Sequence, residues 1–139
     1  MLDLIGVWRL VGGYAIAPET GETVELFGID PSGYAIFEPG GRMMAIVTAD
    51  NRISGASISE MAELFRSMVA YSGRWSIDHD KFITEVDLAS DPSWVGKAQV
   101  RYYTFGGSTL SLRTAPLEHP SFPGRKAIVY AEWRKVEKD

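Results

Sequence analysis

Three polar side chains stand two residues apart in one strand-like run, at Gln99, Arg101 and Tyr103. Alternate residues of a strand face the same side of a sheet, so these three are expected to lie together. An arginine guanidinium presents a fixed fork of donors, which suits a carboxylate, an enolate or a phenolate on a ligand. The alternative is a structural arginine that hydrogen-bonds to Gln99 and to backbone carbonyls. The sequence leaves both interpretations of Arg101 open.

A glycine pair at 106–107 indicates which way this strand faces. A two-residue glycine loop predicts a hairpin in which Tyr103 lies opposite Leu110 and Arg101 lies opposite Leu112. The face that carries both leucines is expected to point inward, which places Arg101 inside as well. A charge in an interior needs partners, and a partly wet cavity with a polar ligand would supply them.

Trp75 and Tyr14 are two further candidates for contact with a ligand. A hairpin at 78–81 turns Trp75 inward, where it is either a ligand contact or part of the core. Simple alternation counted from Trp8 turns Tyr14 inward too. The hydroxyls of Tyr14 and Tyr103 could donate hydrogen bonds to a ligand, although inward tyrosines also serve as packing residues with a polar tip.

The elements that hold these residues are mostly short strands broken by turns, with one helix. Ser57 and Glu60 have the spacing of a capping box, and the apolar spacing that follows predicts a helix over 57–71. Glycines at 12–13 indicate a bulge in the first strand. The chain, 1–139, is expected to form a single all-β domain, a closed antiparallel up-and-down β-barrel of eight or more strands with one α-helix. The expected strands are 7–17, 24–27, 33–38, 42–48, 74–77, 82–88, 97–105, 109–114 and 127–136.

Gly6, Trp8 and Arg134 together indicate how such a barrel closes. The first and last strands become neighbours when a sheet closes on itself. Trp8 can plug the narrow end, and Arg134 from the last strand can lie on the indole face as a cation–π partner. Gly6 lets the entering chain cross close to the floor of the barrel. These three residues are expected to be structural.

An ordered set of motifs runs through almost the whole chain. Together they resemble the small lipocalin-like domain family of bacteria and fungi, a branch of the calycin barrels. The resemblance implies a barrel with an internal cavity, and its relatives include ligand carriers and fungal proteins that shape polyketide-type intermediates. Many members have histidines where this chain has Thr84 and Glu85, so histidine chemistry is not carried over. The motifs are Gly6-Val7-Trp8-Arg9-Leu10-Val11, Phe27-Gly28-Ile29-Asp30-Pro31-Ser32-Gly33-Tyr34, Pro39-Gly40-Gly41-Arg42-Met43, Tyr71-Ser72-Gly73-Arg74-Trp75, Pro92-Ser93-Trp94-Val95-Gly96, Arg101, Leu110-Ser111-Leu112-Arg113-Thr114 and Trp133-Arg134.

Composition and charge argue against several classes of function. The net charge is -4 and the 14 basic residues are scattered, which is not the pattern of a nucleic-acid-binding protein. The absence of cysteine excludes disulfides and thiolate sites and favours a cytoplasmic location. We expect no membrane span, because the sequence has no apolar segment of about 18 residues. We expect no metal site and no cofactor, because His79 and His119 sit in turn-rich sequence without ligand spacing.

The sequence therefore predicts a binding protein whose barrel holds a small, largely apolar molecule with a polar or acidic group. Arg101 and Gln99, with Tyr103, Tyr14 and Trp75, are the expected ligand contacts. One alternative is a metal-free isomerase or cyclase that acts on a polyketide-like or terpenoid-like intermediate in the same cavity. Another is an assembly domain without a ligand, with one sheet face buried in a homodimer. No nucleophile with an adjacent base is apparent, so no catalytic residue is assigned.

Overall fold

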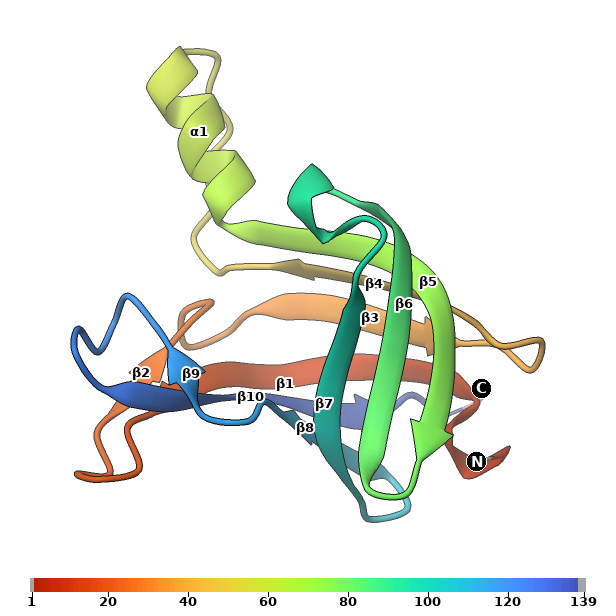
Figure 1. The fold of residues 1–139 in the computed structure, drawn as a ribbon. Helices are drawn as coiled ribbons and strands as arrows, with labels where there is room; N and C mark the ends of the chain where they lie inside the picture. The colour runs from red at the N-terminus through yellow and green to blue at the C-terminus, as the bar shows by residue number, and fades with distance from the viewer. Residues whose placement is uncertain (1, 138–139) are drawn as a thin grey trace.

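The computed structural model describes residues 2–137, and most of them form one antiparallel sheet that closes into a barrel (Figure 1). Eight strands make the barrel, in the order β1-β3-β4-β5-β6-β7-β8-β10, and pairing of β1 with β10 closes it. This confirms the predicted fold class. The strands are β1 (Gly6–Ile16), β2 (Thr23–Glu25), β3 (Ser32–Phe37), β4 (Arg42–Thr48), β5 (Met68–Asp78), β6 (Lys81–Ala89), β7 (Ala98–Phe105), β8 (Thr109–Arg113), β9 (Leu117–Glu118) and β10 (Lys126–Lys135).

The two ends of the barrel are built differently. Short turns join β3 to β4, β5 to β6 and β7 to β8 at one end, where the 3-10 helix η1 (Leu2–Leu4) also lies. We call this the closed end. The longer connections lie at the other, open end, and they include the helix α1 (Ile58–Arg66), the 3-10 helix η2 (Pro92–Trp94) and the short strands β2 and β9. Both ends of the described chain lie beside the closed end (Figure 1).

Strands β3 and β4 show how alternation selects the core. Both faces of this hairpin are apolar in sequence, yet burial alternates strictly along each strand. Ala35 and Phe37 are 2% exposed and face inward, whereas Tyr34 and Ile36 are 46% exposed on the outer face. The inward set joins a core of aromatic and aliphatic side chains that fills the closed half of the barrel. That core includes Leu4, Trp8, Leu10, Phe37, Met43, Trp75, Phe82, Leu110 and Trp133.

Trp8 closes the floor, but its cation is not the predicted Arg134. Trp8 is fully buried, and its Nε1–H donates to the carbonyl oxygen of Leu4 at 2.9 Å. The ammonium of Lys135 lies 5.5 Å from the centre of the indole ring and donates to the carbonyl oxygen of Asp3 at 2.8 Å. Trp133 points inward, so alternation turns Arg134 outward, opposite Arg9. The prediction for Arg134 was wrong by one residue.

The β7–β8 hairpin has a register two residues away from the predicted one, with the same inner face. Tyr103 pairs with Leu112 rather than Leu110, and Phe105 pairs with Leu110. The tight turn is formed by 107–108, and Gly106 donates its N–H to the carbonyl oxygen of Thr109 at 2.9 Å. A shift of two residues preserves the side to which each residue points. The inward direction predicted for Arg101 therefore holds.

The helix starts where it was predicted and ends earlier. The capping box is present: the N–H of Glu60 donates to Ser57 Oγ, and the N–H of Ser57 donates to Glu60 Oε1, each at 3.1 Å. The helix ends at Arg66, because the residues from Met68 onward pair with β4 instead. No residue of α1 is buried, and the helix projects away from the open end (Figure 1). No helix in residues 2–137 is both long and apolar enough to cross a membrane.

Gly73 allows the sharp bend shared by β5 and β6. The pairing of these strands shifts between Ser72 and Gly73, with Asp87 as the extra residue on β6. A Cβ atom at position 73 would collide with the carbonyl oxygen of Glu85 across the bulge. A glycine is therefore required at this point of the paired strands.

The closure contact predicts different effects for two neighbouring substitutions. Lys135→Ala removes a cation–π contact and a hydrogen bond, so the free energy of unfolding should fall by about 1–2 kcal/mol. Arg134→Ala, on the outer face, should change it by less than about 0.5 kcal/mol. Urea unfolding followed by tryptophan fluorescence measures both. Equal losses for the two variants would contradict the closure described above.

Two glycine substitutions test the bend. Gly73→Ala should lower the free energy of unfolding by about 3 kcal/mol, because the new Cβ forces two paired strands apart. Gly12→Ala is the matched control, since Gly12 has an ordinary backbone φ and no atom within 4 Å of the position its Cβ would take. We expect it to stay within about 1 kcal/mol of the parent protein. Thermal unfolding of both variants measures the two effects. An unchanged stability of Gly73→Ala would contradict the predicted collision.

Candidate functional site

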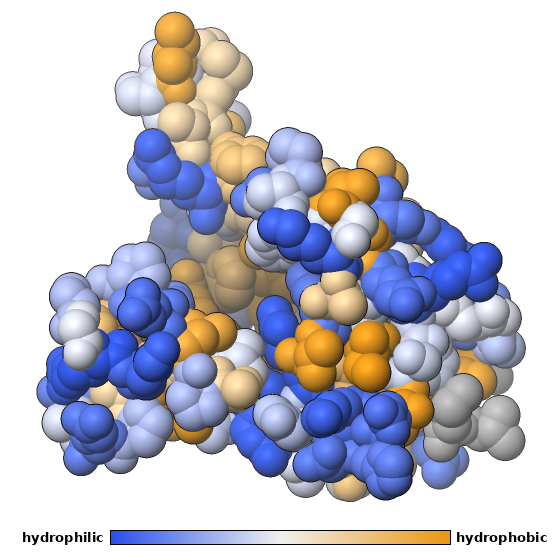
Figure 2. Space-filling model, viewed as in Figure 1, coloured by the Kyte–Doolittle hydropathy of each residue, from blue (hydrophilic) through white to orange (hydrophobic). Residues whose placement is uncertain are grey.

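Gln99 and Arg101 lie on the inner face of β7. Arg101 pairs with Phe82 and Gln99 pairs with Thr84, and both of these partners on β6 are 2% exposed in the interior. Gln99 and Arg101 themselves are only partly buried. Figure 2 shows a hollow at the open end, between the projecting helix and the lobe that carries β2 and β9. Partly exposed inward side chains fit an interior that opens at this end.

Arg101 has no acidic partner in the part of the chain that the structure describes. Among residues 2–137 its one hydrogen-bond acceptor is the carbonyl oxygen of the neighbouring Val100, which Nη1 contacts at 3.0 Å. None of the ion pairs among residues 2–137 includes it. Loss of solvation lowers the pKa of the guanidinium, and the nearby Tyr71 opposes that shift. The strand therefore holds a partly buried positive charge that no acidic side chain among the described residues neutralises.

Tyr71 is the aromatic side chain beside this charge. It lies on the inner face of β5 opposite Ala45, and its ring packs edge-on against Trp94 of η2, with centres 5.7 Å apart. Burial raises the pKa of the Tyr71 hydroxyl, while the positive charge of Arg101 acts in the opposite direction. The hydroxyl therefore stays neutral at ordinary pH and can donate a hydrogen bond. Arg101, Tyr71 and Trp94 form the candidate site.

Sequence reasoning missed Tyr71 and Trp94. Tyr71 was assigned to the end of the helix, although Val69, Tyr71, Gly73 and Trp75 already alternate with polar or small residues. This period of two was the signal for a strand. Trp94 follows a short turn opened by Asp91, whose carboxylate accepts the N–H of Ser93 at 3.0 Å. That turn signal gave no indication that the ring would reach Tyr71.

Tyr103 and Trp75 face inward, but their polar atoms are already engaged. The hydroxyl of Tyr103 donates to the carbonyl oxygen of His79 at 3.2 Å, in the β5–β6 turn at the closed end. Trp75 stacks on Phe82 with ring centres 5.7 Å apart, and its Nε1–H donates to the carbonyl oxygen of Glu38 at 3.3 Å. Trp75 is part of the core, and Tyr103 packs against it.

Tyr14 lies on the outside of the barrel, so its predicted inward orientation was wrong. The β1–β10 pairing shifts between Leu10 and Gly12, and the extra residue reverses the alternation beyond that point. Tyr14 stacks on Tyr130 with centres 5.0 Å apart, and its hydroxyl donates to Glu132 Oε1 at 3.0 Å. Loss of solvation, together with the Glu132 carboxylate, raises the pKa of Tyr14 to about 12. This tyrosine cannot contact a ligand inside the barrel.

A sequence family described as a lipocalin-like domain matches residues 5–136, nearly the whole described chain. The chain belongs to the lipocalin-like domain family. It is also similar to a curated fungal protein of Aspergillus oryzae named 4'-hydroxy-3'-methoxypropiophenone carrier protein ppsC. The two are 31% identical over 86 residues, which cover 55% of this chain and 75% of that protein. These similarities support binding of a ligand by the barrel.

The lipocalin-like barrel carries one more interior donor. The indole Nε1 of Trp133 is buried, and it is the one buried side-chain polar atom without a hydrogen-bond partner in the described part of the chain. Trp133 is 6% exposed and lies on β10 between Leu10 and Leu110. No group of three or more metal-ligating side chains occurs among residues 2–137. Trp133, Tyr71 and Arg101 therefore supply hydrogen-bond donors and a positive charge inside a largely apolar interior.

The stability of Arg101 variants separates a ligand-binding arginine from a structural one. Arg101→Met should leave the free energy of unfolding unchanged or raise it by about 1 kcal/mol, because a poorly solvated charge without a partner is removed. Arg113→Met is the matched control on the outer face, where the guanidinium lies 5.5 Å from the Tyr102 ring centre. That substitution should cost about 0.5–1 kcal/mol. A fall in the free energy of unfolding of more than about 2 kcal/mol for Arg101→Met would show that the arginine has a structural role.

Proposed function

We propose that this lipocalin-like protein is a carrier of a small, largely apolar molecule that bears an acidic or strongly polar oxygen. The ligand lies in the open half of the barrel, and its oxygen pairs with the guanidinium of Arg101. The observation that carries the proposal is the charge of Arg101, which faces the interior without an acidic partner among the described residues. An anionic ligand atom would supply the missing counter-charge.

The surroundings of Arg101 suit an aromatic ligand. The edge-on pair of Tyr71 and Trp94 offers ring surfaces at the open end, 5.7 Å apart between centres. Aromatic rings contribute stacking and edge contacts beyond the area that they bury. The neutral hydroxyl of Tyr71 adds a donor close to the charge. Pockets of this kind are mostly apolar, with a small number of polar groups that fix the orientation of the ligand.

The name of the Aspergillus oryzae relative supports the same class of ligand. It describes a carrier of an aromatic ketone that also has a phenolic hydroxyl. A phenolate or a ketone oxygen could accept both donors of the Arg101 fork, and the aromatic ring could lie against Tyr71. We therefore assign phenolic or acidic aromatic ketones as the first class of ligand to test. Carriage, rather than conversion, requires only that this contact form and break reversibly.

A matched pair of ligands tests this contact. The probes are 4'-hydroxy-3'-methoxypropiophenone and 3'-methoxypropiophenone, which lacks the phenolic hydroxyl, and tryptophan fluorescence follows their binding. We expect the parent protein to prefer the phenol, increasingly so as rising pH ionises it. Arg101→Met should weaken binding of the phenol by about 10- to 100-fold, as expected for loss of a charge-assisted contact, and should change binding of the other probe by less than about threefold.

Two controls make the titration decisive. Arg113→Met keeps the interior intact and should bind both probes as the parent protein does. Mass spectrometry of the recovered phenol should show it unchanged, because a carrier returns its ligand. Equal affinity of the parent protein and Arg101→Met for the phenol would overturn the assignment of Arg101. A converted probe would favour the enzyme alternative instead.

A further inference from the structure

The helix α1 presents an apolar stripe to solvent. Ile58, Met61 and Phe65 recur at helical spacing and are 85%, 51% and 50% exposed. Such a stripe normally faces a core, because burial of apolar surface is what stabilises an amphipathic helix. The charged side chains Glu60 and Glu63 lie on the opposite side of the helix at this spacing. The stripe therefore has no partner among the described residues of its own chain.

The helix nevertheless has a defined attachment to the barrel. The guanidinium of Arg52 donates from Nε to Ser67 Oγ and from Nη2 to the carbonyl oxygen of Leu64, each at 2.9 Å. The capping box fixes the other end of the helix. Side chain and backbone contacts thus hold the helix in place while its apolar stripe remains uncovered.

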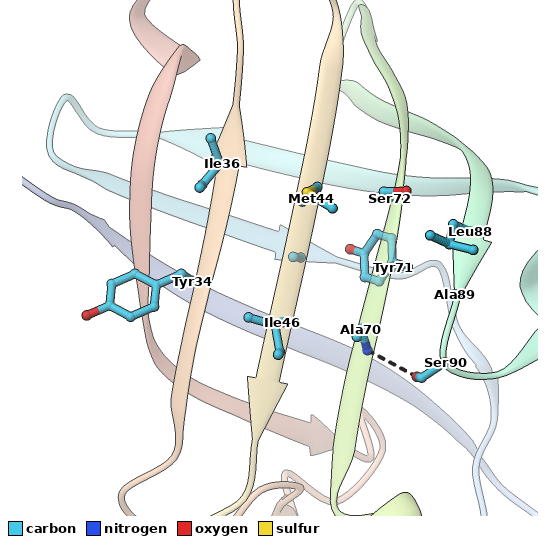
Figure 3. A pocket seen from close by; sticks show the side chains of 11 residues that line it. Tyr34, Ile36, Met44, Ile46, Ala70, Tyr71, Ser72, Leu88, Ala89 and Ser90 are labelled. Carbon is cyan, nitrogen blue, oxygen red and sulfur yellow. Dashed lines mark hydrogen bonds between the residues drawn. The ribbon is translucent and has the colours of Figure 1, made fainter.

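A second apolar surface lies on the outer face of β3, β4, β5 and β6. It contains a groove of about 490 Å³, which we call the outer groove. Met44 and Ile46 form one wall and Leu88 the other, with the small residues Ala70 and Ser72 between them (Figure 3). The three wall residues are 61%, 50% and 64% exposed. A raised edge on each side and small residues along the middle are the shape that receives a helix.

We propose that the outer groove receives α1 of a second copy of this chain, in a reciprocal two-fold dimer. The helix follows β4 and precedes β5, and the outer faces of these same strands form the groove. A two-fold axis near the junction of helix and barrel would set the two chains antiparallel. Each helix would then lie over the β4–β5 face of the other chain. One symmetry operation would therefore cover both the apolar stripe and the outer groove.

Charge and area both favour this arrangement. The stripe on α1 carries no charge, and the ion pair nearest to the outer groove, between Arg42 and Asp87, is already complete. Formation of this helix–groove contact therefore buries no unpaired charge. Judged from their exposed fractions, the stripe and the groove residues of one chain together expose on the order of 1,000 Å², against roughly 800 Å² per partner in a standard stable interface. The stripe alone would not reach that size.

Sedimentation velocity over a range of micromolar concentrations tests the proposal with the intact chain. We expect a dimer for the parent protein. Met61→Asp in the stripe and Met44→Asp in the outer groove should each raise the dimer dissociation constant by at least about 30-fold, as for loss of a central contact residue. Val100→Asp is the matched control, because Val100 is 43% exposed on the outer face of β7, outside the groove.

Mixing the two variants gives a test that a folding defect cannot imitate. Met61→Asp supplies an intact groove, and Met44→Asp supplies an intact helix. Their mixture therefore rebuilds one of the two helix–groove contacts and should dimerise at least about 10-fold more tightly than either variant alone. A parent protein that stays monomeric, a dimer indifferent to both variants, or a mixture no better than its components would each overturn the proposal. A monomer that binds lipid vesicles through Met61 and Met44 would overturn it in favour of a membrane surface.

Discussion

The pairing of β1 with β10 is the constraint on which the rest of the structure depends. It joins the two edge strands of the barrel sheet, so that the side chains on the inner face of the sheet share one interior. Trp8 lies where the two strands meet the floor, with its indole N–H bonded to Leu4 and the ammonium of Lys135 against its ring. Large side chains fill that end. An opening to the interior is therefore expected at the end where α1 and η2 lie.

Two polar groups of the interior lack full partners among the described residues. Trp75, Trp8 and Tyr103 all donate to backbone carbonyls, whereas the buried Nε1–H of Trp133 has no hydrogen-bond partner. Arg101 keeps a charge without an acidic partner, and desolvation lowers its pKa. A local departure from good packing and charge pairing is where function is expected, because it costs stability and contributes nothing to the fold. The proposed carrier function rests on the unpaired charge of Arg101.

The sequence predicted the fold well because closure, alternation and turn chemistry are local patterns. The inward face of Arg101 was predicted correctly even though the glycine turn is displaced, since the register error was an even number of residues. Tyr14 was predicted wrongly because a bulge adds a single residue, which reverses every direction after it. The glycines at 12–13 had indicated that bulge, but not its effect on the side chains that follow.

The end of the helix and the site residue Tyr71 could not be predicted for a related reason. The segment after Arg66 is apolar enough for either a helix or a strand, and pairing with β4 decides between them. That pairing is a contact between distant residues, which intrinsic propensity does not encode. The same choice places Tyr71 beside Arg101 and leaves the apolar stripe of α1 without a core to face.

Native mass spectrometry of the freshly purified protein tests the central claim most directly. The account predicts that part of each preparation retains a small molecule at one copy per chain, and that the retained molecule has an apolar skeleton with an acidic or phenolic oxygen. Arg101→Met should lose this molecule, whereas Arg113→Met should keep it. Ligand-free chains in every preparation that also stay ligand-free after incubation with a phenolic aryl ketone would contradict the account.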